Sequence, residues 1–167
     1  MRDPRAKLPL LLLMALVLHT TLLGSLRVAG VAPDAMLLIA IVGGVAGGPS
    51  TGAIVGFASG LGLDLFLQTP LGLSALAFSI VGYGVGSLQS GILRSAWWIP
   101  IATAFVASMA GETLYALAGA VVGETHMVTT HLGLVAVMVG VLNAVLAPVA
   151  LRLVTWALRS PYEVRYG

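Results

Sequence analysis

Apolar residues fill most of this chain in long runs, which short polar breaks or breaks rich in glycine and proline interrupt. A helix that crosses the hydrocarbon core of a bilayer needs about 20 predominantly apolar residues. The runs therefore predict an all-α integral membrane protein, with six transmembrane helices in a single transmembrane domain over residues 1–167. The predicted helices cover residues 8–26, 35–48, 51–67, 73–88, 98–122 and 132–158.

Two neighbouring predicted helices, 35–48 and 51–67, are short, because Gly47-Gly48-Pro49-Ser50 separates them. Short spans can be accommodated by local thinning of the bilayer or by burial against longer neighbours. The alternative is a re-entrant hairpin formed by these two segments, since irregular backbone at membrane depth is tolerated where protein buries it. In the last predicted helix, Pro148 is a candidate kink.

The basic residues predict how the helices are oriented in the membrane. With six spans, seven of the eight Lys and Arg residues fall on one side, and only Arg27 falls on the other. Lys and Arg near helix ends collect on the cytoplasmic side, so both termini are predicted to be cytoplasmic, an N-in, C-in topology. The seven residues are Arg2, Arg5, Lys7, Arg94, Arg152, Arg159 and Arg165.

Composition excludes a sizeable soluble domain. Charged residues make up 8% of the chain, against roughly 25% in a soluble domain, and the mean hydropathy is +1.05. No basic patch lies away from the helix ends, so no nucleic-acid binding is expected. The chain has no cysteine, which excludes disulfides and thiolate metal sites. The first apolar run exceeds the roughly 7–15 residues of a signal-peptide core, so we interpret it as a retained helix.

Glycines recur every four residues along the third predicted helix. The series is Gly48, Gly52, Gly56 and Gly60, and Asp64 continues it. Small residues at this spacing allow helix backbones to approach closely in lipid. The candidate facing glycines are Gly43, Gly47, Gly82 and Gly86. We predict a tightly packed core of the second, third and fourth helices; a docking groove for another transmembrane helix is the compatible functional interpretation.

Two carboxyl groups fall within predicted helices, where a charge costs about 2.5–3.5 kcal/mol at mid-membrane. Asp64 is either a functional acid or a hydrogen-bonded structural one near the outer interface. Glu112 lies deeper, about 21 Å along its helix from Trp98, and is predicted to be protonated, paired or facing a cavity. Its candidate partners are Tyr83, Tyr115, Asn143 and Arg27. An intramembrane Asn is more typical of an interhelical hydrogen bond than of a ligand contact.

Other motifs do not predict chemistry. The run Ile80-Val81-Gly82-Tyr83-Gly84 is similar to a potassium-channel filter, but it lacks the filter's threonine and follows no short pore helix. His126 and His131, near Glu124, lack the HExxH spacing and a defined third ligand, so no metal site is expected. We interpret His19 as a satisfied residue within the first helix. No nucleophile–base pair or phosphate loop occurs, so neither an enzyme nor a cofactor is expected.

Five stretches of the central segment carry a further signal in their order and spacing. They are Pro33-Asp34, Gly48-Pro49-Ser50-Thr51-Gly52, Gly56-Phe57-Ala58-Ser59-Gly60-Leu61-Gly62-Leu63-Asp64-Leu65, Thr69-Pro70-Leu71-Gly72-Leu73 and Val81-Gly82-Tyr83. A weaker stretch runs from Asn143 through Pro148 to Arg152. Together with the total length, these stretches resemble the rod shape-determining protein MreD family, over about a third of the chain.

The resemblance implies a non-enzymatic protein of the bacterial cytoplasmic membrane that takes part in cell elongation. It implies MreC as the direct partner, and RodA, a class B penicillin-binding protein and MreB as partners through the complex. The implied fold is similar to the S-component of energy-coupling-factor transporters, which has six helices. This chain lacks the basic residue often found in the turn at 48–51, and Gly62 and Gln68 are less usual. A contact that relies on a basic inner turn is therefore in doubt.

Two functional hypotheses follow. The leading one is a scaffold that binds the transmembrane helix of MreC through the second to fourth helices and the outer loops. The residues expected in this contact or in helix packing are Gly52, Gly56, Gly60, Asp64, Pro70, Gly72, Gly82 and Tyr83. The competing hypothesis is a small-molecule-binding transporter subunit, with an outer cavity lined by Glu112, Tyr83 and Asn143.

Overall fold

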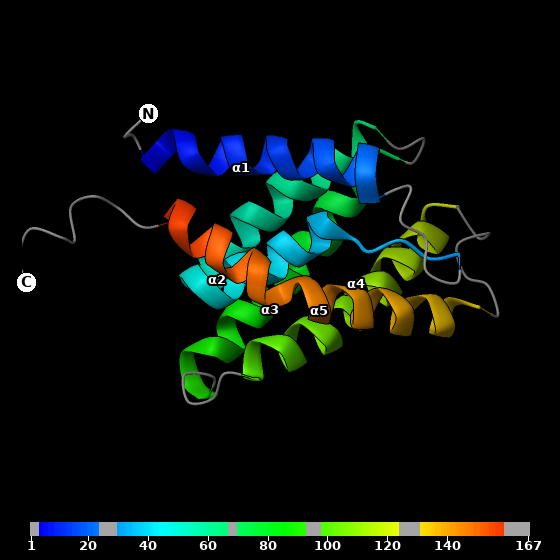
Figure 1. Cartoon of the computed structure of the whole chain (residues 1–167). Helices are drawn as coiled ribbons and strands as arrows, with labels where there is room; N and C mark the ends of the chain where they lie inside the picture. The colour runs from blue at the N-terminus through cyan, green and yellow to red at the C-terminus, as the bar shows by residue number, and fades with distance from the viewer. Residues whose placement is uncertain (1–3, 24–29, 67–69, 93–97, 124–130, 159–167) are drawn as a thin grey trace, which may run out of the picture.

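The protein is a bundle of helices, seen here in a computed structural model that describes residues 4–23, 30–66, 70–92, 98–123 and 131–158. The all-α prediction is confirmed. The helices are α1 (Pro4–Leu18), its π-helical continuation η1 (His19–Leu23), α2 (Ala35–Asp64), α3 (Leu73–Ile92), α4 (Ile99–Val121) and α5 (Leu132–Leu158). Helix α1 begins and α5 ends at the same end of the bundle (Figure 1).

Helix α2 consists of two antiparallel arms. At Gly48 the backbone adopts φ 81° and ψ −173°, a conformation essentially restricted to glycine, and Pro49 follows. A Cβ atom built on Gly43 would lie 3.1 Å from the side chain of Val55, whereas a straight helix would separate these residues by about 18 Å. The chain therefore reverses at Gly48, and residues 35–47 and 49–64 run side by side (Figure 1).

This reversal changes how the segments relate to the membrane. By length and apolar composition, α4 and α5 could each cross a bilayer, as α2 could if it were straight, and shorter apolar helices lie at Lys7–Thr21 and Leu73–Leu88. The arms of α2 are only about 20 and 24 Å long at 1.5 Å per residue, less than the roughly 30 Å of the hydrocarbon core. The two helices predicted at 35–48 and 51–67 are thus the arms of one folded-back helix, and the second ends at Asp64.

The core of the bundle surrounds the first arm of α2. Asp34 precedes this arm and caps it: its Oδ1 accepts hydrogen bonds from the backbone N–H groups of Met36 at 2.9 Å and Leu37 at 3.0 Å. Residues 36–44 are all buried, and α2 contacts each of α1, α3, α4 and α5. A helix that is apolar on every side suits the centre of a bundle or the interior of a membrane. Neighbouring helices surround this arm. The backbone at the ends of this short helix is therefore covered by protein rather than exposed to lipid.

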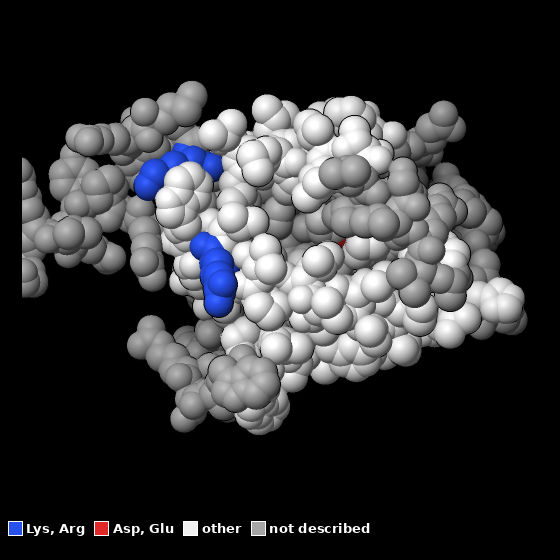
Figure 2. Space-filling model, in the orientation of Figure 1, with Lys and Arg blue, Asp and Glu red and all other residues white. Residues whose placement is uncertain are grey.

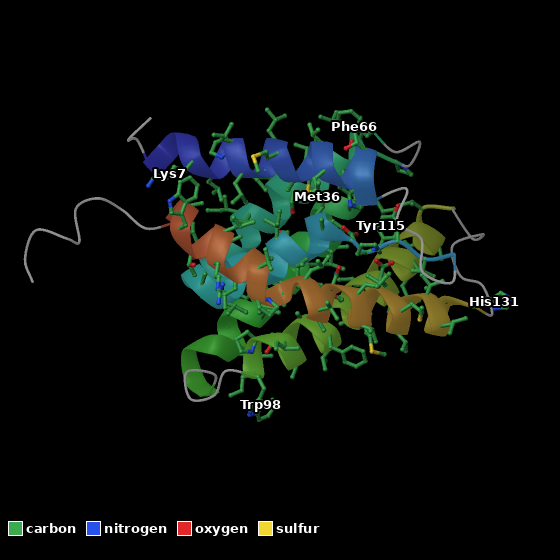
Figure 3. The ribbon with its side chains drawn as sticks, viewed as in Figure 1. Lys7, Met36, Phe66, Trp98, Tyr115 and His131 are labelled. Atoms are coloured by element: carbon green, nitrogen blue, oxygen red, sulfur yellow. The ribbon has the colours of Figure 1, made fainter. Side chains whose placement is uncertain are left out.

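The start of α1 and the end of α5 lie at a basic end of the bundle (Figure 1, Figure 2). The ammonium group of Lys7 lies 5.2 Å from the centre of the Trp156 ring, which joins α1 to α5 by a cation–π contact. The visible Lys and Arg side chains gather at this same end (Figure 2). Tyr115 and His131 lie toward the opposite end, away from Lys7 (Figure 3).

Candidate functional site

The predicted glycine stripe lies inside the protein, between the second arm of α2 and α3. A Cβ atom on Gly52 would clash with the backbone carbonyl of Gly82, and one on Gly56 would clash with that of Phe78. A Cβ atom on Gly60 would come within 2.5 Å of the Ala75 nitrogen. These glycines allow the two helix backbones to touch, as small residues do in lipid.

The facing helix contributes its own small residues to this contact. Gly82 faces the carbonyl of Gly52, and Gly86 lies against the peptide between Gly48 and Pro49. The Ser79 hydroxyl adds a hydrogen bond of 3.1 Å to the Ala53 carbonyl across the interface. The stripe is therefore filled by α3, and no open groove for a partner runs along it.

Asp64 joins the end of α2 to the start of α3. Its carboxylate is 1% exposed and accepts backbone N–H groups from Gly72 at 2.8 Å, Ser74 at 3.1 Å and Ala75 at 3.3 Å. Gly72 directly precedes α3, and Ser74 and Ala75 lie in its first turn, where the N–H groups have no acceptor within the helix. Gly72 turns the chain with φ 95°, and Pro70 is exposed in the same turn. The geometry gives Asp64, Pro70 and Gly72 a shared structural role.

Two of the residues expected beside Glu112 lie elsewhere. Tyr83 is 55% exposed on the outer face of α3. Asn143 is fully buried, and its Nδ2 donates a hydrogen bond of 2.9 Å to the Ser108 hydroxyl, which joins α5 to α4. Neither residue lines the cavity that contains Glu112, so the predicted lining by Tyr83 and Asn143 is wrong. Arg27, the other distant candidate, falls outside the described residues.

The pair of Asn143 and Ser108 permits a test of interhelical coupling. We expect Asn143→Ala and Ser108→Ala to be non-additive by about 0.6 kcal/mol, the usual size of such a bond between membrane helices. Unfolding free energies of both single variants and the double variant in mixed micelles would measure this coupling. Thr113→Ala, which removes only a bond to the Met109 carbonyl of its own helix, should show no coupling to Asn143→Ala. A coupling of zero between Asn143 and Ser108 would contradict the assignment.

A cavity of about 360 Å³ opens between the helices, toward the end of the bundle away from the start of α1 and the end of α5 (Figure 3). Its polar lining comes from elements far apart in sequence: η1, the residue before α2, the start of α3, and α4. Residues 30–33, which precede Asp34, and apolar residues of α2, α3 and α5 complete the wall. The polar lining residues are His19, Asp34, Ser74, Glu112 and Tyr115.

The acids in this cavity are held in place by helix geometry. Asp34 is fixed by its two hydrogen bonds at the start of α2. Glu112 and Tyr115 are three residues apart on α4 and so share one face of that helix. Burial raises the pKa of the Asp34 carboxyl, whereas a positive charge on the nearby His19 and the two backbone N–H groups act to lower this pKa.

Two buried polar atoms at the cavity have no hydrogen-bond partner among the described residues. They are the Ser74 hydroxyl oxygen and Nδ1 of His19. We expected the polar atoms of His19 to be hydrogen-bonded, and this expectation is wrong for its Nδ1 atom. The sequence prediction singled out neither Ser74 nor Asp34 as a cavity residue. The Asp34 carboxylate directly before an apolar run was the available signal, since that position caps a helix and places the acid at its end.

Metal binding finds no support in this arrangement. Within the described ranges, no three His, Asp or Glu side chains come together in a group that could hold a metal ion. Glu124 and His126 lie outside those ranges.

The fold and the cavity define an all-α membrane protein with helices apolar enough to cross a bilayer.

The family of the chain follows from comparison with known proteins. The family model described as rod shape-determining protein MreD matches residues 5–157 of the 167-residue chain. The chain therefore belongs to this family and is a rod-shape-determining membrane protein, as its sequence resemblance predicted. The family is a shape-determining one and is not a known family of enzymes. No curated protein and no solved structure matches the chain.

Proposed function

We propose that this protein is a non-enzymatic scaffold of the bacterial elongation complex in the cytoplasmic membrane. In this role it binds MreC and helps to regulate lateral peptidoglycan synthesis and cell shape; RodA, a class B penicillin-binding protein and MreB are reached through the complex. The observation that carries the proposal is the family match over residues 5–157. The architecture supports it, because the functional requirement is an apolar helical surface rather than a reactive centre.

The proposed topology has six helical segments and both termini in the cytoplasm. The two arms of α2 count as separate segments, because the chain reverses at Gly48. This count is supported by the position of the start of α1 and the end of α5 at one end of the bundle (Figure 1). The bias of seven basic residues against one supports the cytoplasmic assignment of that end.

For the MreC contact we propose the outer face of α3 around Gly84. A Cβ atom on Gly84 would meet nothing within 4 Å, although glycine inside a helix costs about 0.8–1 kcal/mol relative to alanine. No contact within the described part of the chain therefore requires a residue without a side chain at position 84. An open glycine beside the exposed Tyr83 ring suits the close approach of a second transmembrane helix. The occupant we assign is the transmembrane helix of MreC.

Replacing Gly84 with leucine tests this surface. We expect Gly84→Leu to lower the recovery of co-expressed MreC about tenfold, because a bulky side chain at a close helix contact removes roughly 1.4 kcal/mol or more of binding free energy. The thermal stability of the isolated chain should not fall, because leucine favours a helix more than glycine does. The measurement is mild-detergent co-purification of MreC with the tagged chain, quantified against the recovered bait.

The matched control is Gly133→Leu. Gly133 is also a helical glycine whose added Cβ would meet nothing within 4 Å, but it lies at the start of α5. Its variant should retain MreC at the wild-type level. Equal recovery of MreC by Gly84→Leu and Gly133→Leu would contradict the α3 surface and leave the scaffold role standing. Failure of the wild-type chain to co-purify MreC would overturn the scaffold role itself.

A further inference from the structure

The cavity between the helices has the size and the composition of a small-molecule site. Its volume of about 360 Å³ falls within the roughly 300–1,000 Å³ of ligand pockets in proteins. Its walls are mostly apolar, and the polar groups converge from separate elements. In the space-filling view, part of an acidic residue is visible in a hollow between the helices (Figure 2).

The titratable side chains of the lining are mostly acidic. Asp34 and Glu112 both line the cavity, no Lys or Arg is among its described lining residues, and His19 is the one basic side chain there. Of the two Asp34 oxygens, Oδ1 accepts the two capping N–H groups. One imidazole does not balance two carboxyl groups, and an uncompensated buried charge is costly in an apolar environment. A positively charged guest would offset this cost.

An unpartnered group in the wall points to a ligand independently of the acids. Ser74 is 0% exposed and lines the cavity, yet its hydroxyl has no hydrogen-bond partner among the described residues. Most buried hydroxyls in proteins are hydrogen-bonded, and an exception calls for a missing water, ion or ligand. A hydroxyl oxygen can accept a hydrogen bond from an N–H donor. The Ser74 group therefore suits the same guest as the two carboxylates.

We propose that this cavity binds a small organic cation, namely a protonated primary amine that carries an apolar or aromatic group. The ammonium group is held by the carboxylates of Asp34 and Glu112 and by the Ser74 hydroxyl. The apolar part packs against Phe78 and the valines of α5 that line the cavity. Aromatic rings also attract cations through their faces, and both Phe78 and Tyr115 are in the wall. This site does not depend on the contact with MreC.

The probe for this site is benzylamine, tested on the full-length chain in detergent. Benzyl alcohol is its neutral counterpart of the same shape, and benzoate is the anionic one. We expect saturable binding of benzylamine with a Kd of roughly millimolar or tighter, the range that a fragment of this size reaches. The alcohol should bind at least tenfold more weakly, and benzoate should not bind. Isothermal titration and the shift in unfolding temperature provide two readouts.

Variants of the cavity wall separate charge from space. Glu112→Gln keeps the shape but removes a group that can carry a negative charge beside the bound ammonium, and should weaken benzylamine binding about tenfold or more, since hydrogen bonds between charged groups are the strong ones. Val135→Phe places a ring into the cavity and should abolish binding. Its matched control is Val137→Phe, two residues along α5 and 38% exposed, which should bind benzylamine as the wild type does.

Each outcome bears on the proposal. Equal binding of benzylamine and benzyl alcohol would overturn the choice of a cation. Wild-type affinity in Val135→Phe would place the ligand outside the cavity and overturn the site. If Glu112→Gln does not fold, Ser74→Ala takes its place, with an expected loss of about tenfold in affinity, because its hydroxyl accepts a hydrogen bond from the charged ammonium group. The absence of saturable benzylamine binding to a folded wild-type chain would also refute the proposal.

Discussion

Replacing Gly52 with alanine is expected to disrupt the fold of this protein. The added Cβ would clash with the carbonyl oxygen of Gly82, and would come within 2.6 Å of the carbonyl carbon of Gly82 and 2.7 Å of the Gly44 Cα. These are backbone atoms of both flanking segments, so no side-chain rotation relieves the clash. The two arms of α2 and the neighbouring α3 would have to move apart together.

The expected size of this effect follows from overpacking. Extra methylene groups in a packed core cost about 1–3 kcal/mol and occasionally more, and Gly52→Ala affects two backbone contacts at once. In a chain of this length 1 kcal/mol corresponds to about 2–4 °C. We therefore expect the unfolding temperature in detergent to fall by about 10 °C, or the variant to yield little folded protein. Thermal unfolding and size-exclusion chromatography measure both outcomes.

Gly84→Ala is the matched control for Gly52→Ala. It adds the same methyl group to a helical glycine, but with nothing within 4 Å of the new Cβ. The higher helix propensity of alanine should leave stability unchanged or raise it by up to about 1 kcal/mol. If Gly52→Ala unfolded at the same temperature as Gly84→Ala, the backbone contact between α2 and α3 would be wrong.

The same contact decides how the glycine stripe can be tested. The sequence alone suggested that a bulky residue in place of Gly56 would probe a docking groove for MreC. In the structure Gly56 faces the Phe78 carbonyl, and a Cβ atom there would also lie 2.9 Å from the Ser79 nitrogen. Gly56→Leu would therefore damage the fold before it reported on any partner. A useful probe of the partner surface must lie on the opposite side of α3.

The extent of the helices was predictable because apolar runs carry that information locally. Predicted segments 98–122 and 132–158 correspond to Ile99–Val121 and Leu132–Leu158. The reversal in α2 was harder to predict, since Gly48-Pro49 marks a break but not its direction. That direction depends on the φ of one glycine and on contacts between residues such as Gly43 and Val55, which are distant in sequence. Periodicity alone does not contain those contacts.

The cavity was predictable only in part for a similar reason. Glu112 was expected to be protonated, paired or facing a cavity, and Tyr115, three residues along the same helix, was among its candidate partners. Tyr83 was the wrong choice, since its neighbour Gly82 faces α2. Successive helical residues are rotated by about 100°, so the Tyr83 side chain points away from that interface. His19 and Ser74 line the cavity because separate helices bring them together, and the sequence alone does not show how those helices pack.

Replacing Asp64 with alanine is expected to have an effect comparable to that of Gly52→Ala, through hydrogen bonding rather than packing. The change removes the acceptor of three backbone N–H groups, on Gly72, Ser74 and Ala75. A buried donor that loses its acceptor costs about 1–3 kcal/mol, and water does not readily replace it in a buried turn. We expect Asp64→Ala to lose roughly 3 kcal/mol or more of unfolding free energy, measured by denaturant titration in mixed micelles.

Asp64→Asn removes the charge of this group but only part of its hydrogen bonding. Asparagine keeps one acceptor oxygen, but its amide nitrogen would face the N–H donors that the other carboxylate oxygen accepts. It also removes the negative charge at the N-terminus of α3, which the helix dipole stabilises. Its stability should therefore fall between those of Asp64→Ala and the wild type. Thr113→Ala, which removes an exposed hydroxyl bonded within its own helix, should change stability by less than about 0.5 kcal/mol. An Asp64→Ala protein as stable as Thr113→Ala would show that these bonds do not hold the turn between α2 and α3.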